Sequence, residues 1–333
     1  MNQKNHLYSL DLLRGFSGYG VAFCHLHAFI YKNIHLEYFS LLFVEFFFVL
    51  SGFVLYPQLI RILDNKSNLA IFYQRRWIRT LPLYFIVIFL VSSIFDETLS
   101  KDFFMYLLFN QKITPDVLSS DYYPVAWSLS IEEFFYLFFP LIIIFLGRDG
   151  LIKKVIILFV IIMIAKLLLA DKVESNFFRT GTLFRFDAIL LGFILRFFQD
   201  KILKYKYISS VILLVLIFVF YFAESYVLAN EEEYIIKVTF IILLQILSLL
   251  TLNTFLIFEP IMKINLIKNF SILISRQTYS VYLVHIIFIY FLEKAQFNIY
   301  NTISIYVLLL FISSSLIYYF IERPLLKMRP KLK

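Results

Sequence analysis

The chain has 333 residues, of which 61% are hydrophobic and 20% aromatic, while only 16% carry a charge. Soluble domains average about 45–50% apolar and about 25% charged residues, so this composition excludes an ordinary soluble globular protein. The net charge is +8, but the basic residues lie in short loops, which favours contact with anionic lipid over nucleic-acid binding. The single cysteine excludes an intrachain disulfide and a cysteine metal cluster, and we expect no metal.

Apolar runs long enough to cross a lipid bilayer recur along the whole chain and predict an all-α, polytopic membrane bundle of about ten transmembrane helices. We expect the spans at residues 8–30, 38–60, 72–95, 125–147, 153–170, 183–199, 207–223, 235–258, 275–293 and 302–321. The apolar piece Phe103–Phe109 is too short to span and is expected to be interfacial or re-entrant. We expect one integral membrane domain over residues 1–333.

The loop charges alternate in sign when ten spans are counted. The basic set comprises Lys4, Arg61, Lys66, Arg148, Lys153, Lys154, Lys201, Lys204, Lys206, Lys263, Lys268, Lys327, Arg329, Lys331 and Lys333. The acidic or mixed set comprises Asp96, Glu97, Asp102, Asp116, Asp121, Asp171, Glu174, Glu224, Glu231, Glu232 and Glu233. The positive-inside rule then predicts that both termini are cytoplasmic. We expect a multi-pass protein of the cytoplasmic membrane.

The first span, LDLLRGFSGYGVAFCHLH, contains the ionisable residues Asp11, Arg14, His25 and His27. Ionisable groups inside a bilayer are costly and usually mark a pathway or a reaction site. Arg14 and His25 are eleven residues apart, which returns to nearly the same helix face about 16 Å further along the axis. His25 is therefore a candidate general base, with a hydrogen bond between helices as the alternative. Arg14 can pair with Asp11 one turn earlier, or reach a lipid headgroup.

Three arginines, Arg75, Arg76 and Arg79, stand at the beginning of the third span in FYQRRWIRTLPLYF. Arg76 and Arg79 are three residues apart and share a helix face. Paired guanidinium groups suit phosphate, which they bind through bidentate, charge-assisted hydrogen bonds. The alternative is flanking charge of the positive-inside kind.

Two adjacent glutamates, Glu132 and Glu133, open the fourth span in WSLSIEEFFY, which begins at Trp127. The predicted topology puts them in the outer half of the membrane, at the level of His25. One carboxylate could orient the imidazole while the other contacts substrate, and the sequence does not decide which. The alternative is that both are surface carboxylates at the water boundary.

Other polar residues within apolar runs are weaker candidates for substrate contact or helix pairing. They are Glu45, Ser51, Trp127, Arg185, Asp187, Arg276 and His285. Arg185 and Asp187 are two residues apart and do not face each other on a regular helix, so we expect each to pair with another helix. His285 is expected either to make a structural hydrogen bond or to take part in substrate or proton contacts.

These segments together resemble the acyltransferase-3 family of integral membrane acyltransferases. The resemblance runs in order through LDLLRGFSGYGVAFCH, FFFVLSGFVL, FYQRRWIRTLPLYF, AWSLSIEEFFYLFFP, FRFDAILLGF, SRQTYSVYLVH and IERPL, and covers nearly the whole chain. The spacing Arg-x10-His combined with WSLSIEEFFY is its specific part. The resemblance implies an enzyme that moves an acyl group, commonly acetyl, from cytoplasmic acyl-coenzyme A to a hydroxyl of a cell-surface or lipid-linked glycan.

The resemblance also implies roles for particular residues. The family histidine corresponds to His25, the first-span arginine to Arg14, the RxxR pair to Arg76 and Arg79, and the acidic pair to Glu132 and Glu133. Some family members carry an additional C-terminal hydrolase-like domain, which this sequence does not show, so we expect a stand-alone enzyme and leave open whether it needs a partner.

The expected mechanism places the donor nucleotide on the arginines and the thioester near His25. Direct transfer and an acyl-histidine intermediate both stay open, as do the acceptor and the acyl length. The alternative function is a transporter or flippase for a glycan or lipid, in which the same ionisable groups form a proton relay.

Overall fold

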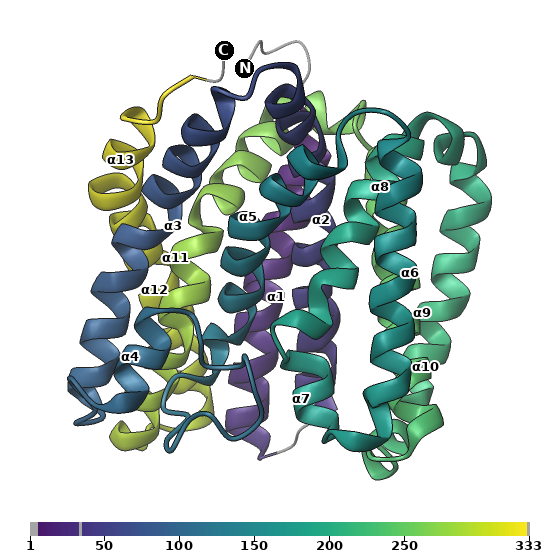
Figure 1. Ribbon diagram of the computed structural model, residues 1–333. Helices are drawn as coiled ribbons and strands as arrows, with labels where there is room; N and C mark the ends of the chain where they lie inside the picture. The colour runs from purple at the N-terminus through teal and green to yellow at the C-terminus, as the bar shows by residue number, and fades with distance from the viewer. Residues whose placement is uncertain (1–5, 33–34, 332–333) are drawn as a thin grey trace. The chain divides into compact units, whose positions relative to one another are not determined.

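The computed structural model describes residues 6–32 and 35–331, and these residues are overwhelmingly helical with no β-strand among them (Figure 1). The α-helices are α1 (Tyr8–Tyr31), α2 (His35–Asp64), α3 (Asn68–Ile94), α4 (Lys101–Leu107), α5 (Trp127–Leu146), α6 (Leu151–Leu169), α7 (Ser175–Thr180), α8 (Phe186–Ile202), α9 (Lys206–Ala229), α10 (Tyr234–Ile257), α11 (Asn265–Ala295), α12 (Ile299–Ile317) and α13 (Arg323–Lys327). Short 3-10 turns are η2 (Pro124–Ala126), η3 (Ala170–Lys172), η4 (Leu183–Arg185), η5 (Leu203–Tyr205) and η6 (Ile261–Lys263), and η7 (Tyr318–Glu322) is a π-helical turn. The predicted all-α fold is confirmed.

Within the described residues, seven helices are long and apolar enough to cross a membrane by length and composition. They are Tyr38–Asp64, Asn68–Ile94, Pro124–Leu146, Tyr207–Ala229, Tyr234–Ile257, Asn265–Ala295 and Ile299–Lys327. The other three predicted spans are α1, which contains Asp11 and Arg14, α6, which contains three lysines, and α8, which has only 17 residues. The polytopic helical architecture is confirmed, while the count of ten and the cytoplasmic termini stay predictions. Lys4 and Lys333, which entered the charge pattern, lie outside the described residues.

The helices cluster into two compact units. The first takes the described residues up to Leu50 together with Phe198–Glu231 and Thr239–Tyr318. The second takes Ser51–Phe197, Glu232–Val238 and the described residues from Tyr319 onward. The chain passes from the first unit to the second within α2. This division into two units does not test the single membrane domain expected from the sequence, which stays a prediction.

In the first unit, α1 and α11 lie side by side and run parallel (Figure 1). Two glycines of α1 permit the close approach. A Cβ atom on Gly15 would lie 2.3 Å from Ile274 Cγ1, and one on Gly18 would lie 2.7 Å from Thr278 Cγ2. The polar residues of α1 are thereby held in a fixed register against those of α11.

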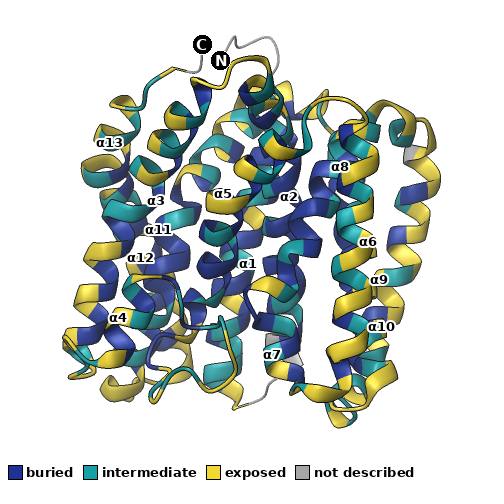
Figure 2. Cartoon of the chain, in the orientation of Figure 1, coloured by how far each residue is buried: buried dark blue, intermediate teal, exposed yellow. Residues whose placement is uncertain are grey.

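The helix α9 is the least buried of the candidate spans. Only 11% of its most apolar stretch is buried, and Figure 2 shows most of its length as exposed or intermediate. A helix that is apolar all round is stable only in lipid or inside protein. The exposed apolar surface of α9 therefore fits a lipid-facing position.

In the second unit, α2 and α8 touch at Gly52, where a Cβ atom would lie 1.8 Å from the carbonyl oxygen of Ile189. Near this crossing, Lys166 Nζ of α6 donates to Asp187 Oδ2 at 2.8 Å, and Arg185 Nε lies 3.6 Å from Asp187 Oδ1. Pairing of this kind makes buried charges tolerable.

The expectation that Asp187 pairs with another helix is confirmed by its contact with Lys166. The expectation that Arg185 and Asp187 do not approach each other is wrong. Arg185 ends the 3-10 turn η4 rather than lying on a regular α-helix, and its long side chain reaches the neighbouring carboxylate.

Candidate active site

His25 of α1 and His285 of α11 form a hydrogen-bonded imidazole pair in the first unit. The distance from His25 Nδ1 to His285 Nε2 is 2.9 Å, and the ring centroids are 5.2 Å apart. His285 is buried, whereas His25 is half-buried. On the other side of its ring, His285 Nδ1 lies 2.7 Å from the carbonyl oxygen of Tyr282 and 3.2 Å from that of Val281.

These contacts assign the tautomers of both rings. A carbonyl oxygen can only accept, so the Nδ1 of neutral His285 carries the ring hydrogen and its Nε2 is the acceptor. His25 Nδ1 must then donate to His285 Nε2, and the lone pair of neutral His25 lies on Nε2. His25 Nε2 makes no hydrogen bond to any residue that the structure describes. An imidazole that is oriented by a second group in this way can act as a general base.

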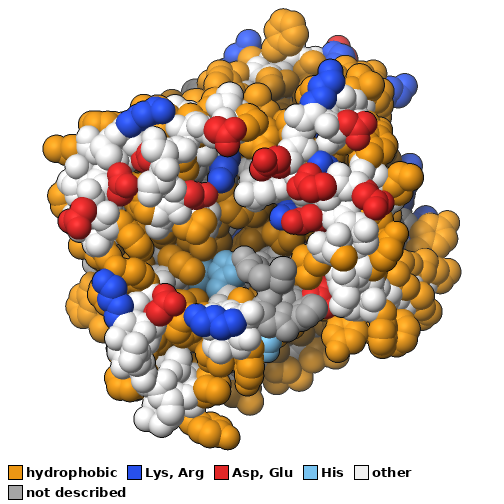
Figure 3. Space-filling model, turned by 90° about the horizontal axis from the view of Figure 1, so that it is seen from below, with side chains coloured by type: hydrophobic (Ala, Val, Ile, Leu, Met, Phe, Trp, Pro, Cys, Tyr) orange, Lys and Arg blue, Asp and Glu red, His pale blue; other side chains and the backbone are white. Residues whose placement is uncertain are grey.

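Histidine atoms are open to view on the face drawn in Figure 3, where hydrophobic side chains adjoin them. An imidazole can therefore be reached from this end of the helices. His25 itself is half-buried.

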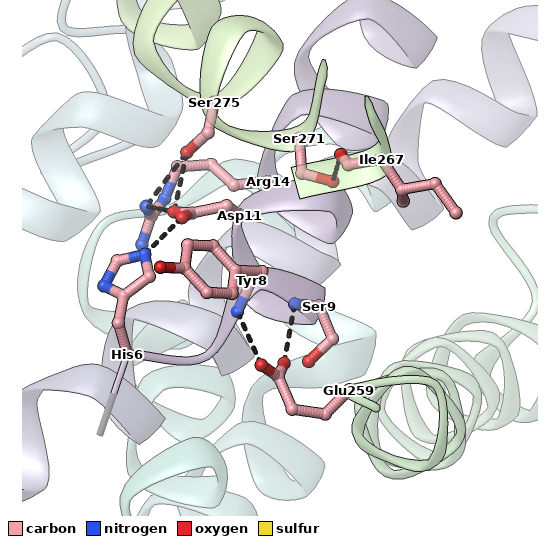
Figure 4. A network of polar contacts seen from close by, with 9 residues as sticks. All are labelled: His6, Tyr8, Ser9, Asp11, Arg14, Glu259, Ile267, Ser271 and Ser275. Carbon is pink, nitrogen blue, oxygen red and sulfur yellow. Dashed lines mark hydrogen bonds and ion pairs between the residues drawn. The ribbon is translucent and has the colours of Figure 1, made fainter. Parts of the chain in front are cut away.

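At the other end of α1, a polar network surrounds Asp11 (Figure 4). His6 Nε2 lies 2.5 Å from Asp11 Oδ2, and the Ser275 hydroxyl donates to Asp11 Oδ1 at 3.0 Å. Arg14 Nη1 lies 3.4 Å from Asp11 Oδ1 and 3.3 Å from Ser275 Oγ. The hydrogen bond to Asp11 raises the pKa of His6. The expected pair between Asp11 and Arg14 is present.

Arg14 and His25 both contact α11, through Ser275 and His285 respectively. The shared helix face predicted from their spacing is therefore confirmed. The beginning of α1 is fixed by Glu259, whose carboxylate accepts from the backbone N–H groups of Tyr8 at 3.2 Å and Ser9 at 2.9 Å (Figure 4). A carboxylate at this position satisfies N–H groups that the first turn of a helix leaves unbonded.

In the second unit, Glu132 of α5 is held from two sides. The Ser51 hydroxyl donates to Glu132 Oε1 at 2.8 Å, and the Tyr136 hydroxyl donates to Oε2 at 2.7 Å. The guanidinium carbon of Arg76 lies 4.7 Å from the centre of the Tyr136 ring. Arg76 and Glu132 thus meet around one tyrosine, which links the third span to the fourth.

Glu133 is buried beside this cluster, and the Thr80 hydroxyl hydrogen-bonds its carboxylate. Its Oε1 atom has no hydrogen-bond partner among the described residues. Arg76 is also buried, whereas Arg75 and Arg79 are half-buried. The predicted arginine and glutamate motifs therefore lie together within the second unit.

The remaining sequence candidates have the following positions. Glu45 is buried within α2, Trp127 is the first residue of α5, and the guanidinium of Arg276 lies 5.8 Å from the Tyr318 ring centre. Within residues 6–32 and 35–331, no group of three or more His, Cys, Asp or Glu side chains is arranged to hold a metal ion.

The predicted contact between His25 and Glu132 or Glu133 joins residues of different units and stays a prediction. Within the first unit, the neighbour of His25 Nδ1 is His285. Sequence reasoning did not identify Tyr136 as a site residue, although its position four residues after Glu132 was a usable signal. It also did not foresee the role of Ser275, which has no distinguishing local pattern.

Comparisons with known proteins indicate the family of the chain. A family model described as an acyltransferase domain matches residues 7–322. The O-acetyltransferase OatA of Staphylococcus aureus (strain NCTC 8325 / PS 47) is 28% identical over 371 residues, which cover 98% of this chain and 58% of that relative. The chain therefore spans only part of the length of this relative.

Two further relatives align with a smaller share of this chain. An uncharacterized protein of Haemophilus influenzae is 28% identical over 60% of this chain and 93% of its own length. The putative acetyltransferase ORF330 of Acidianus two-tailed virus is 32% identical over 42% of this chain and 42% of its own length. No solved structure matches the chain. Because the family model covers nearly all of it, the chain belongs to the acyltransferase-3 family of acyltransferase domains.

Proposed function

We propose that this chain is an O-acyltransferase of the cytoplasmic membrane. It moves an acyl group, acetyl in the simplest case, from cytoplasmic acyl-coenzyme A to a hydroxyl of a cell-surface or lipid-linked glycan. The observation that carries the proposal is the His25–His285 pair, which leaves His25 Nε2 with a lone pair and no protein partner among the described residues. Family membership supports acyl transfer, and the name of the staphylococcal relative supports acetyl as the group and a hydroxyl as its acceptor.

The proposed chemistry is a direct acyl transfer. His25 Nε2 removes the proton of the acceptor hydroxyl while the hydroxyl oxygen attacks the thioester carbonyl carbon. The new carbon–oxygen bond forms, the carbon–sulfur bond breaks, and the leaving thiolate takes the proton from His25. His25 returns to its neutral form, so no second base is needed to complete the cycle.

His285 is proposed as a positioning residue for His25. By accepting from His25 Nδ1, it keeps the lone pair on the opposite nitrogen and fixes the plane of the ring. A positive charge on His25 during proton transfer is favoured by a hydrogen-bond acceptor at Nδ1, because protonated imidazole donates from both nitrogens.

The donor is proposed to lie along the arginines. Arg76 and Arg79 share a face of α3 and would hold phosphate groups of coenzyme A. A role of Arg14 in donor binding stays a separate prediction from the sequence. Glu132, fixed by Ser51 and Tyr136, stays proposed as a catalytic contact together with Glu133.

The test replaces His25 with alanine and follows transfer of radiolabelled acetyl groups in membrane vesicles. Loss of a general base should lower kcat by about 10² to 10⁴-fold. His27→Ala on the same helix is the matched control and should retain nearly normal turnover. Normal turnover by His25→Ala would exclude the assignment, and movement of a glycan without release of free coenzyme A would indicate a transporter. Mass spectrometry of surface glycans with and without the gene would identify the acceptor from the loss of one acetyl mass.

A further inference from the structure

The C-terminal tail brings a fourth guanidinium group to the arginines of α3. The short helix α13 packs beside α3, and Arg75 Nη1 donates to the carbonyl oxygen of Pro330 at 2.5 Å. Burial, and then the positive charges of Arg79, Arg75 and Arg76, lower the pKa of Arg329 to about 9. Four guanidinium groups of the second unit are therefore close enough to repel one another. We call them the arginine cluster.

The arginine cluster has no carboxylate partner at ion-pair distance among the described residues. The Nε atoms of Arg75, Arg76 and Arg329 are buried without a hydrogen-bond partner in the same part of the chain. Arg76 is only 8% exposed. The carboxylates of Glu132 and Glu133 on α5 attract it electrostatically, although they lie beyond ion-pair distance. Buried donors without acceptors and like charges in proximity both cost free energy, so the arrangement is suited to a bound anion.

The number of cations indicates what kind of anion fits. One phosphate is saturated by one or two guanidinium groups, which bind it in a bidentate manner. Four guanidinium groups match a ligand with several phosphates, such as a pyrophosphate together with a phosphomonoester. A soluble nucleotide and an anionic lipid headgroup share this chemistry.

We propose that Arg75 and Arg329 complete, with Arg76 and Arg79, a site for the polyphosphate end of a nucleotide, and that the C-terminal tail closes over it as a strap. Naming that nucleotide as coenzyme A rests on the proposed function. Arg329 lies beyond residues 7–322, so the family match does not assign it. The tether between Arg75 and Pro330 keeps the tail in place beside the site.

The experiment measures binding of coenzyme A to the full chain in nanodiscs of zwitterionic lipid by titration calorimetry. Arg329→Ala should weaken coenzyme A binding by about tenfold or more, because a charge-assisted contact is lost. Arg329→Lys should restore part of the affinity. Lys331→Ala is the matched control, since Lys331 is exposed in the same tail and should leave the affinity within about twofold. Inorganic pyrophosphate should compete with coenzyme A on the unaltered chain.

A second measurement distinguishes a ligand role from a structural one. Without ligand, Arg329→Ala should unfold at the same temperature as the unaltered chain or a higher one, because repulsion within the arginine cluster is relieved. Equal affinity of the two proteins for coenzyme A would overturn the proposal. The proposal would also be overturned if Arg329→Ala reduced only the retention of phosphatidylglycerol in mixed nanodiscs and left coenzyme A binding unchanged.

These outcomes are separable from the fate of the proposed function. His25→Ala should bind coenzyme A as tightly as the unaltered chain. Binding that depends on Arg329, in a protein that transfers no acyl group, would support the polyphosphate site and refute the acyltransferase proposal.

Discussion

Replacing His285 with alanine tests whether the second imidazole sets the tautomer of His25. The substitution removes the acceptor 2.9 Å from His25 Nδ1 and leaves the rest of α1 in place. His25 can then carry its hydrogen on either nitrogen, and its ring is free to rotate. In the proposed mechanism, only the form with the lone pair on Nε2, in the observed ring orientation, can act as the base.

The size of the effect follows from the hydrogen bond that is lost. A neutral hydrogen bond contributes about 0.5–1.5 kcal/mol net, and a donor left unsatisfied costs about 1–3 kcal/mol. Each 1.36 kcal/mol is a factor of about ten in rate. Because His25 is half-buried, water can partly replace the missing ring, so we expect kcat to fall by about tenfold. Loss of His25 itself should cost about 10² to 10⁴-fold.

The assay measures initial rates of acetyl transfer while acetyl-coenzyme A is varied. A positioning role predicts a lower kcat with an unchanged KM for acetyl-coenzyme A. His285→Gln should recover part of the rate, because its side-chain carbonyl oxygen can accept from His25 Nδ1. The reasoning is refuted if His285→Ala keeps full kcat in membranes where His25→Ala is inactive.

Three further predictions address other parts of the structure. Gly52→Ala should destabilise the protein, because a backbone carbonyl 1.8 Å from the new Cβ forces α2 and α8 apart. Overpacking costs about 1–3 kcal/mol, which outweighs the gain of about 1 kcal/mol in helix propensity. An unchanged unfolding temperature in detergent would contradict this prediction. Tyr136→Phe keeps the ring but leaves Glu132 Oε2 without its donor, so the free energy of unfolding should fall by about 1–3 kcal/mol. An unchanged free energy of unfolding in chemical denaturation would show that water replaces the hydroxyl. Since Asp11 raises the pKa of His6, the pair should stabilise the fold below about pH 6.5 and lose this effect as the pH rises through the raised pKa. The difference in unfolding temperature between the unaltered chain and His6→Ala should therefore be largest at acid pH. The stabilisation should be about 1 kcal/mol or less at this partly exposed site.

Features that depend on one helix could be predicted from the sequence. Arg14 and His25 lie in one uninterrupted helix, so the helical period fixes their common face without knowledge of the neighbours. The same holds for the pairing of Asp11 with Arg14. The beginning of α11 was misplaced by ten residues, since Lys268 and Asn269 interrupt the apolar run while the helix itself continues.

Features that depend on packing between distant segments could not be predicted. His285 is 260 residues from His25, and its ring nitrogen reaches His25 only because α11 packs on α1 in one particular register. Arg329 has the sequence character of an ordinary flanking charge, and its neighbours become apparent only when α13 packs beside α3. In both cases the local pattern is compatible with several partners, and the choice is made by tertiary contacts.

The long separation between the two histidines has a consequence for biosynthesis. Chains are synthesised from the N-terminus at about 5–20 residues per second, so α1 precedes α11 by about 13 to 50 seconds. During that interval His25 has no ring partner and Ser275 has not yet reached Asp11. A nascent or truncated chain that stops before α11 therefore holds an imidazole of undefined tautomer. Under the proposed mechanism, incomplete copies should therefore lack acyl-transfer activity.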